Sequence, residues 1–180
     1  MRKLLSLTCL VLAAAVRAAS NDSALDLKIA TQFDAIVRMA AEPEIVNAVL
    51  AQNRALPPAF AAMTQEKWAA LDNLDPFVFQ FKSNAVGKVL QKLPHPLTSE
   101  AFVNDAAGYK VGFLEKTTNW RHRGKPKHDQ PMAGAIWRGP VELDASSGTK
   151  QVQVAVPILS DGKPIGSLVV GLNIFELAKL

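Results

Sequence analysis

Residues 151–172 read QVQVAVPILSDGKPIGSLVVGL, and they carry the clearest structural pattern in the chain. The first half alternates, with valines at positions 152, 154 and 156 on one face of a strand and polar or small residues on the other. Ser160-Asp161-Gly162-Lys163 is typical of a tight turn. The apolar run from Ile165 to Leu172 then predicts a partner strand, so the stretch predicts an antiparallel hairpin.

A second hairpin is expected earlier in the chain. Ala101-Phe102-Val103 leads into a turn-like segment from Asn104 to Gly108, and Lys110 to Leu114 is the predicted return strand. The polar residues 117–132 predict irregular structure. Two short strand candidates follow, at Ala135–Trp137 and Val141–Leu143.

The first half of the chain predicts helices. Apolar residues recur every three or four positions from Leu25 to Ala41, and Pro43 restarts the helix, because proline is favoured in a first turn. Further helices are predicted after Thr64 and from Asp75 to about Leu90. Helices first, followed by about five antiparallel strands, predict an α+β fold with the long N-terminal helix packed on or beside the sheet.

The N-terminus has the layout of a secretory signal peptide. Arg2 and Lys3 precede an apolar run from Leu4 to Val16, and small residues follow around Ala18. We therefore predict a signal peptide over residues 1–18 and one exported, periplasmic domain over residues 19–180. The alternative is an uncleaved anchor, although the run is shorter than the roughly 20 residues of a membrane span.

Loss of the signal peptide changes the charge of the chain. The full sequence has 20 basic and 16 acidic residues, and removal of Arg2, Lys3 and Arg17 leaves 17 basic residues against 16. The mature charge is near zero, which argues against a nucleic-acid partner. Cys9, the only cysteine, also leaves, so no disulfide is expected. No later segment approaches membrane-spanning length.

Several segments together resemble one family. The residues concerned are IVNAV (45–49), FVNDAAGYKV (102–111), KTTNW (116–120), LDAS (143–146) and VAVPILSDGKPIGSLVVG (154–171). In this order they resemble Cache domains, the PAS-like sensor domains found outside the cytoplasmic membrane. The resemblance implies a long N-terminal helix, a five-stranded antiparallel PAS-like sheet, and a ligand pocket between the sheet and a segment that crosses it.

The resemblance also implies a function. Cache domains bind a small metabolite and pass that state to a partner. Family members are usually the outer part of a membrane receptor, with a membrane helix after the last strand. This chain stops at Leu180, so we expect a separate membrane receptor as its partner.

The crossing segment from Lys116 to His128 departs from the family, whose members often carry an acidic, aromatic stretch there. Here it is basic, and Arg121 and Arg123 are predicted to form an anion-binding rim over the pocket. The planar fork of arginine suits carboxylate and phosphate oxygens. The alternative is a solvated basic loop, as charge runs usually are.

Three further residues are candidate ligand contacts. Trp120 and Trp137 flank the crossing segment and could form an aromatic pocket wall, or simply pack in the core. Asp144 could receive a ligand ammonium group, as carboxylates do in amino-acid-binding relatives, or cap a turn through its own backbone.

Metal binding and catalysis have little support in the sequence. His122 and His128 are six residues apart, which is not a metal-ligand spacing, and no motif for a nucleophile elbow, zinc protease or phosphate loop is present. We expect no cofactor, no metal and no enzyme activity. The expected ligand is a small anionic metabolite, such as a carboxylate or amino acid. The alternatives are a protein-interaction module without a small ligand, or an enzyme with an unrecognised site.

The signal peptide predicts the mature N-terminus. Because Val16-Arg17-Ala18 precedes Ala19, the exported protein is expected to begin near Ala19. N-terminal sequencing of the exported fraction measures this directly, and a sequence that starts at Met1 would contradict the cleavage.

Overall fold

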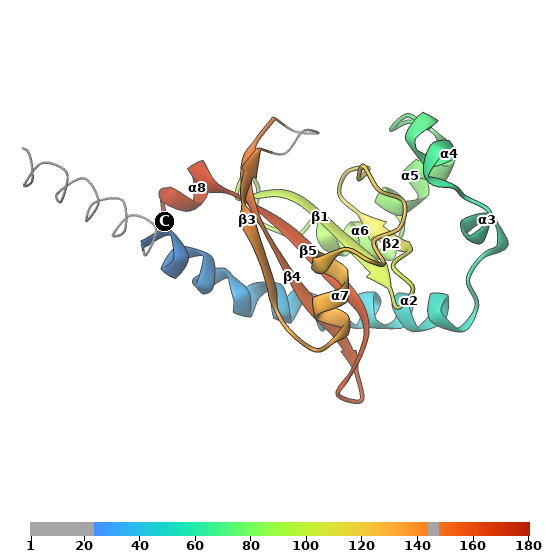
Figure 1. Ribbon diagram of the computed structural model, residues 1–180, viewed down its shortest axis with the longest axis horizontal. Coiled ribbons are helices and arrows are strands. Elements are labelled where there is room, and N and C mark those ends of the chain that lie inside the picture. The colour runs from blue at the N-terminus through green and yellow to red at the C-terminus, as the bar shows by residue number, and fades with distance from the viewer. Residues whose placement is uncertain (1–23, 144–147) are drawn as a thin grey trace, which may run out of the picture.

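The computed structural model describes residues 24–143 and 148–180 (Figure 1). The predicted signal peptide and the candidate ligand contact Asp144 lie outside these ranges. A helix covers residues 24–40, and α2 (Pro43–Arg54) continues it with Pro43 in its first turn. The long N-terminal helix and its restart at Pro43 are therefore confirmed.

The remaining helices are short, with four to eight residues each. They are α3 (Pro58–Ala61), α4 (Gln65–Ala70), α5 (Pro76–Ser83), α6 (Ala85–Leu90), α7 (Pro126–Met132) and α8 (Ile174–Ala178). The single helix expected from Asp75 to Leu90 is divided in two at Asn84. The side chain of Asn84 accepts a hydrogen bond from the Gly87 amide and so caps the start of α6.

Five antiparallel strands form one sheet, as the sequence predicts. They are β1 (Thr98–Asp105), β2 (Lys110–Phe113), β3 (Trp137–Leu143), β4 (Lys150–Ser160) and β5 (Lys163–Asn173), in the order β2-β1-β5-β4-β3. The two short strands expected around Gly139-Pro140 are one strand, β3, whose register with β4 shifts between Arg138 and Val141. This shift accommodates Pro140, which has no amide to donate to a ladder.

Helix α7 differs from the prediction, because residues 117–132 were expected to be irregular. Pro126 stands in its first turn, and His128 and Pro131 are its buried residues. Its sequence lacks an apolar stripe because the sheet surface beneath it is itself polar. Helical periodicity in hydrophobic residues is therefore no guide here.

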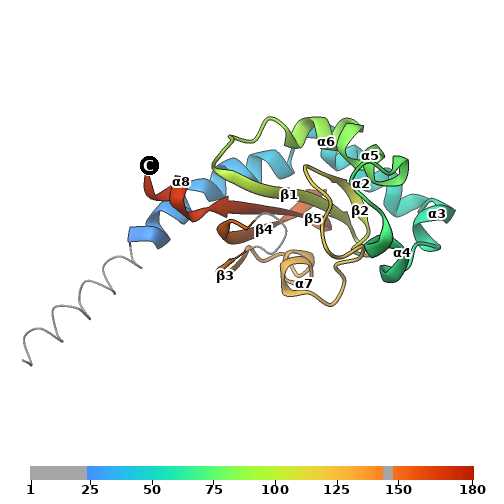
Figure 2. The ribbon, with the colours of Figure 1, turned by 90° about the horizontal axis from the view of Figure 1, so that it is seen from above.

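Helices cover both faces of the sheet. Figure 2 shows α2 and α6 on one side of the sheet and α7 on the other. On the first side, the valines at positions 152, 154 and 156 are buried in a core with residues of the 24–40 helix, α2 and α6. On the second side, Phe102, Ala155 and Val169 join a separate aromatic cluster built mainly from α3, α4, α5 and Trp120. Side chains on both faces of the central strands are therefore buried.

The hairpin between β4 and β5 closes through a turn that requires two left-handed residues. Asp161 has φ 50° and Gly162 has φ 72°. This combination is typical of a type I′ turn, in which Asp-Gly is a favoured pair. The predicted hairpin is confirmed, with Ser160 paired to Lys163.

Replacing Gly162 with valine is expected to destabilise the domain by about 1–3 kcal/mol, because a β-branched residue resists positive φ. Open space surrounds the position, so the cost is conformational and not steric. Urea denaturation measures the change. Gly162→Asn is the matched control, since asparagine tolerates this conformation, and equal stability of the valine and asparagine variants would contradict the turn assignment.

Candidate functional site

The second face of the sheet carries polar side chains that are removed from solvent. They come from β1, β2, β4 and β5 and are Asn104, Lys110, Gln151, Gln153 and Ser167, with Glu100 partly buried beside them. The two glutamines alternate with the core valines of β4 and therefore point to the opposite face. Gly171 pairs with Glu100 and Gln153, and an added Cβ there would collide with polar side chains of this group. Glycine at this position thus leaves room for them.

The segment between β2 and α7 crosses over this face. It is held near Gly108, whose carbonyl accepts a hydrogen bond of 2.8 Å from the His122 amide, and by a bridge between Tyr109 and Arg121. Beyond it, α7 packs against β4 and β5. The sheet, the crossing segment and α7 thereby enclose the polar side chains.

One hydrogen-bonded group centres on Glu100. Its carboxylate accepts from Gln151 Nε2 at 2.8 Å and also from Gln153 Nε2. Gln153 Oε1 in turn accepts from Lys127 Nζ of α7 at 2.7 Å. Gln153 thus links the carboxylate of Glu100 on β1 to the ammonium group of Lys127 on α7.

A second group centres on Lys110, whose side chain is fully buried. Its Nζ donates to Asn104 Oδ1 at 2.9 Å, contacts His122 Nδ1, and lies 4.2 Å from the centre of the Phe102 ring. Burial lowers the pKa of Lys110 well below its usual value. Burial and the neighbouring Lys110 hold the pKa of His122 far below its usual range, so His122 is neutral.

Ser167 connects this group to α7. Asn104 Nδ2 donates to Ser167 Oγ at 2.9 Å, and Ser167 Oγ lies 2.9 Å from His128 Nδ1. Burial also lowers the pKa of His128. Among the described residues, every buried side-chain nitrogen and oxygen has a hydrogen-bond partner.

A cavity of about 210 Å³ opens between the sheet and the crossing segment. It is lined by Glu100, Phe102, Thr117, Thr118, Asn119, His122, Lys127, Glu142, Leu143 and Gln153. The walls therefore offer carboxylates, an ammonium group, an imidazole, amides and hydroxyls within one small volume. Such a wall suits a small polar molecule that carries charged groups.

The two predicted tryptophans lie elsewhere. Trp120 is 2% exposed and packs in the aromatic cluster, with its ring centre 5.0 Å from that of Trp68. Its Nε1 donates to the Phe60 carbonyl at 3.3 Å. Trp137, partly buried at the start of β3, packs against the same cluster. These positions match the core-packing alternative for both residues, and neither lines the polar cavity.

The two predicted arginines are exposed. Arg121 Nε donates to the Ala107 carbonyl at 2.8 Å, and its guanidinium lies 4.6 Å from the centre of the Tyr109 ring. Arg123 lines a different, open hollow beside His128 and Asp129. The structure therefore does not bring these two side chains together at the polar cavity, and their ligand contacts stay a prediction, as does that of Asp144.

Sequence reasoning missed the residues that do line the cavity. Glu100, His122, Lys127 and Gln153 come from β1, the crossing segment, α7 and β4, so no local spacing connects them. One signal was present, because Gln151 and Gln153 alternate with valines in a strand that sits within an apolar hairpin. Polar residues on one face of a strand that is otherwise apolar indicate that another polar segment covers that face.

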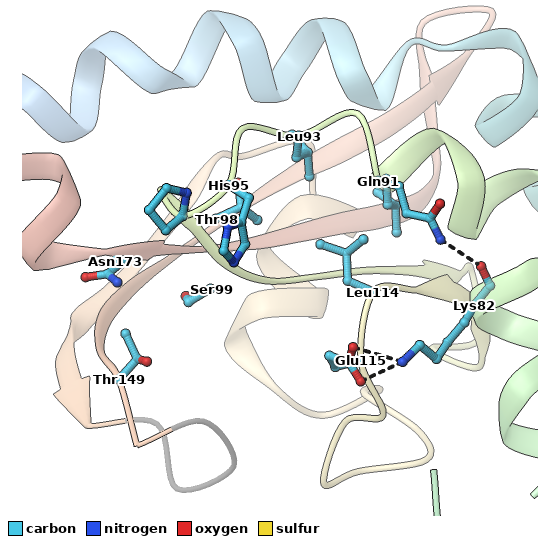
Figure 3. A pocket seen from close by; sticks show the side chains of 12 residues that line it. Lys82, Gln91, Leu93, His95, Thr98, Ser99, Leu114, Glu115, Thr149 and Asn173 are labelled. Atoms are coloured by element: carbon cyan, nitrogen blue, oxygen red, sulfur yellow. Dashed lines mark hydrogen bonds and ion pairs between the residues drawn. The ribbon is translucent and has the colours of Figure 1, made fainter. Parts of the chain in front are cut away.

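A second hollow, of about 500 Å³, lies where β1 begins (Figure 3). Its lining is more apolar and includes Leu90, Leu93 and Leu114, while an ion pair of 2.8 Å joins Lys82 to Glu115 at one side.

Two further features bear on the kind of site. Within residues 24–143 and 148–180, no cluster of three or more histidine, cysteine, aspartate or glutamate side chains is arranged to hold a metal ion. In the same ranges, none of the helices combines the length and apolar character of a membrane span.

Comparison with known proteins finds likeness in structure only, since no family model and no curated sequence matches the chain. The sensor domain of the V. cholerae histidine kinase DctB superposes with a TM-score of 0.52 and 15% identity, over 93% of this chain and 59% of that one. The ligand-binding domain of the Pseudomonas fluorescens chemoreceptor CtaA, in complex with L-alanine, superposes with a TM-score of 0.46 and 15% identity. The match covers 91% of this chain and 61% of that one. The ligand-binding domain of the Campylobacter jejuni chemoreceptor Tlp3, in complex with 4-methylisoleucine, superposes with a TM-score of 0.44 and 16% identity. The match covers 86% of this chain and 62% of that one.

The chain thus spans about three fifths of the length of these sensor domains. The likeness to the DctB sensor domain concerns the fold, and it confirms the α+β architecture with helices followed by a five-stranded antiparallel, PAS-like sheet.

Proposed function

We propose that this chain is an extracytoplasmic sensor domain that binds a small charged metabolite in the cavity between the sheet and the crossing segment. One observation carries the proposal: the cavity walls bring an acid, a base and several hydrogen-bonding groups together on a face that is otherwise buried. A purely structural contact between α7 and the sheet would be served better by apolar side chains, because buried polar groups cost free energy unless they are paired.

The charges in the wall favour a ligand with a carboxylate. Lys127 Nζ lies on the α7 side and would face a carboxylate, while Glu100 on β1 would face an ammonium group if the ligand is an amino acid. A charge-assisted hydrogen bond of this kind contributes about 1.5–3 kcal/mol. The volume of about 210 Å³ equals that of about seven water molecules, so the ligand is small.

We further propose that the domain is exported to the periplasm and relays ligand binding to a membrane receptor. Lys127 is part of α7, and Gln153 and Glu100 belong to the sheet, so a ligand that contacts all three would tighten α7 against the sheet. A partner that touches α7 or the crossing segment could read this change. The alternative, a protein-interaction module without a small ligand, is favoured by the larger and more apolar hollow at the start of β1.

A thermal-shift screen of small carboxylates and amino acids tests the proposal. At least one compound is expected to raise the melting temperature, since a ligand that binds only the folded state stabilises it. The best compound is then titrated against Lys127→Met, which should weaken its affinity about 10- to 150-fold, the equivalent of one lost charge-assisted bond.

Lys88→Met is the matched control, because Lys88 is exposed on α6 away from the cavity, and it should bind like the parent. Arg121→Ala and Arg123→Ala test the predicted rim in the same titration. A loss of affinity confined to either arginine variant would indicate that the ligand binds at the exposed loop that carries Arg121 and Arg123, and not in the cavity. If no compound shifts the parent, the interaction module becomes the better account.

A further inference from the structure

The geometry points to Lys110 as a positioning residue: it holds His122 as the tautomer that carries its proton on Nε2, and this N–H faces the cavity as a donor for a ligand oxygen. The inference rests on the proposed function, since it names the group of the cavity wall that selects a ligand acceptor.

The contact between Lys110 Nζ and His122 Nδ1 fixes the tautomer. A lysine ammonium group donates three hydrogen bonds and accepts none, so Nδ1 must offer its lone pair. A neutral amine, in contrast, can either donate to Nδ1 or accept from an Nδ1–H group, so it is the charged form of Lys110 that fixes the tautomer. With Lys110 charged, the remaining proton of the neutral imidazole lies on Nε2.

The other ring nitrogen, Nε2, has no hydrogen-bond partner within residues 24–143 and 148–180. His122 forms its side-chain hydrogen bond through Nδ1, and Nε2 bonds to no side chain or backbone group of the described residues. Because no fully buried side-chain nitrogen in those residues lacks a partner, Nε2 retains accessible surface. His122 lines the polar cavity, so that surface faces the cavity.

The surroundings keep the imidazole neutral. Lys110 of β2 and Lys127 and His128 of α7 each oppose a positive charge on His122, as does Lys125 before α7. Glu100 and Asp105 of β1 face Lys110 and favour its charged form. A cation on His122 would therefore stand in buried contact with a second cation. His122 remains a neutral donor that can bind a carboxylate or carbonyl oxygen and cannot accept from an ammonium group.

The tautomer can be measured without any ligand. The chain has three histidines, so long-range ¹H–¹⁵N correlations of the ¹⁵N-labelled protein resolve each imidazole. His122 is expected to show the Nε2–H pattern at neutral pH and no protonation on acidification to the edge of the folded range. His95, which is exposed and lies outside the polar cavity, is the internal reference for the spectra.

Lys110→Met removes the donor and keeps the length of the side chain. In this variant His122 is expected to populate both tautomers and its pKa to rise, because the repulsion from Lys110 is gone. Lys88→Met should leave the pattern unchanged. A Nδ1–H tautomer in the parent, or a pattern that Lys110→Met does not alter, overturns the inference. The parent spectrum decides the tautomer even if Lys110→Met fails to fold.

A pair of small probes tests the direction of the Nε2–H. Acetate is expected to shift the His122 Nε2 resonance in the parent, whereas ethylammonium of similar size is not. If acetate raises the melting temperature and leaves this resonance unmoved, His122 is not the contact and the inference fails while the proposed function stands. If neither acetate nor the carboxylate library binds, the proposed function fails, and the tautomer measurement still decides the role of Lys110.

Discussion

The structure depends on one constraint: both faces of the sheet are covered, yet only one face is apolar along its whole length. The valines of β4 bury an ordinary core beneath the N-terminal helices, while the opposite face presents glutamine, asparagine, serine and lysine. A buried polar group without a partner costs about 1–3 kcal/mol, so each of these side chains must be paired once α7 closes over them. The linked hydrogen bonds around Glu100 and Lys110 are the result.

The aromatic cluster sets where that closure occurs. Trp120 belongs to the crossing segment but packs among Phe60, Trp68 and Phe81, which come from helices at one end of the sheet. The segment is thus anchored by aromatic packing before the cavity and by α7 after it. A cavity held from both sides is largely formed in advance, which reduces the ordering cost of binding.

The sequence predicted what local periodicity encodes. Alternation over residues 151–159, the Asp161-Gly162 turn and the three-to-four spacing from Leu25 each reflect a repeat within one element, and all three elements are present. Helix α7 was not predicted, because its buried residues, His128 and Pro131, do not form an apolar stripe. The division of the helix at Asn84 was not predicted, because a capping residue inside an apolar run has the same pattern as a continuous helix.

The site was harder to predict because the sign of a side chain's charge does not show whether that side chain points toward the cavity or toward solvent. Arg121 and Arg123 are the obvious cations of the crossing segment, but both are exposed, and the partly buried Lys127 lines the cavity instead. Which of these side chains turns inward depends on α7 and on the bridge at Tyr109, neither of which has a clear sequence pattern. Glu100 and Gln153 lie on strands that β5 separates, and their side chains hydrogen-bond across Gly171, a contact that no local pattern predicts.

The small volume of the cavity sets a limit on how little ligand the domain could detect. A space of about 210 Å³ admits roughly seven non-hydrogen atoms if each replaces one water molecule. The best small ligands gain about 1.5 kcal/mol per such atom, which gives a ceiling of about 10 kcal/mol and a dissociation constant on the order of tens of nanomolar. A sensor built on this cavity would therefore give no response to a metabolite whose concentration stays well below that value.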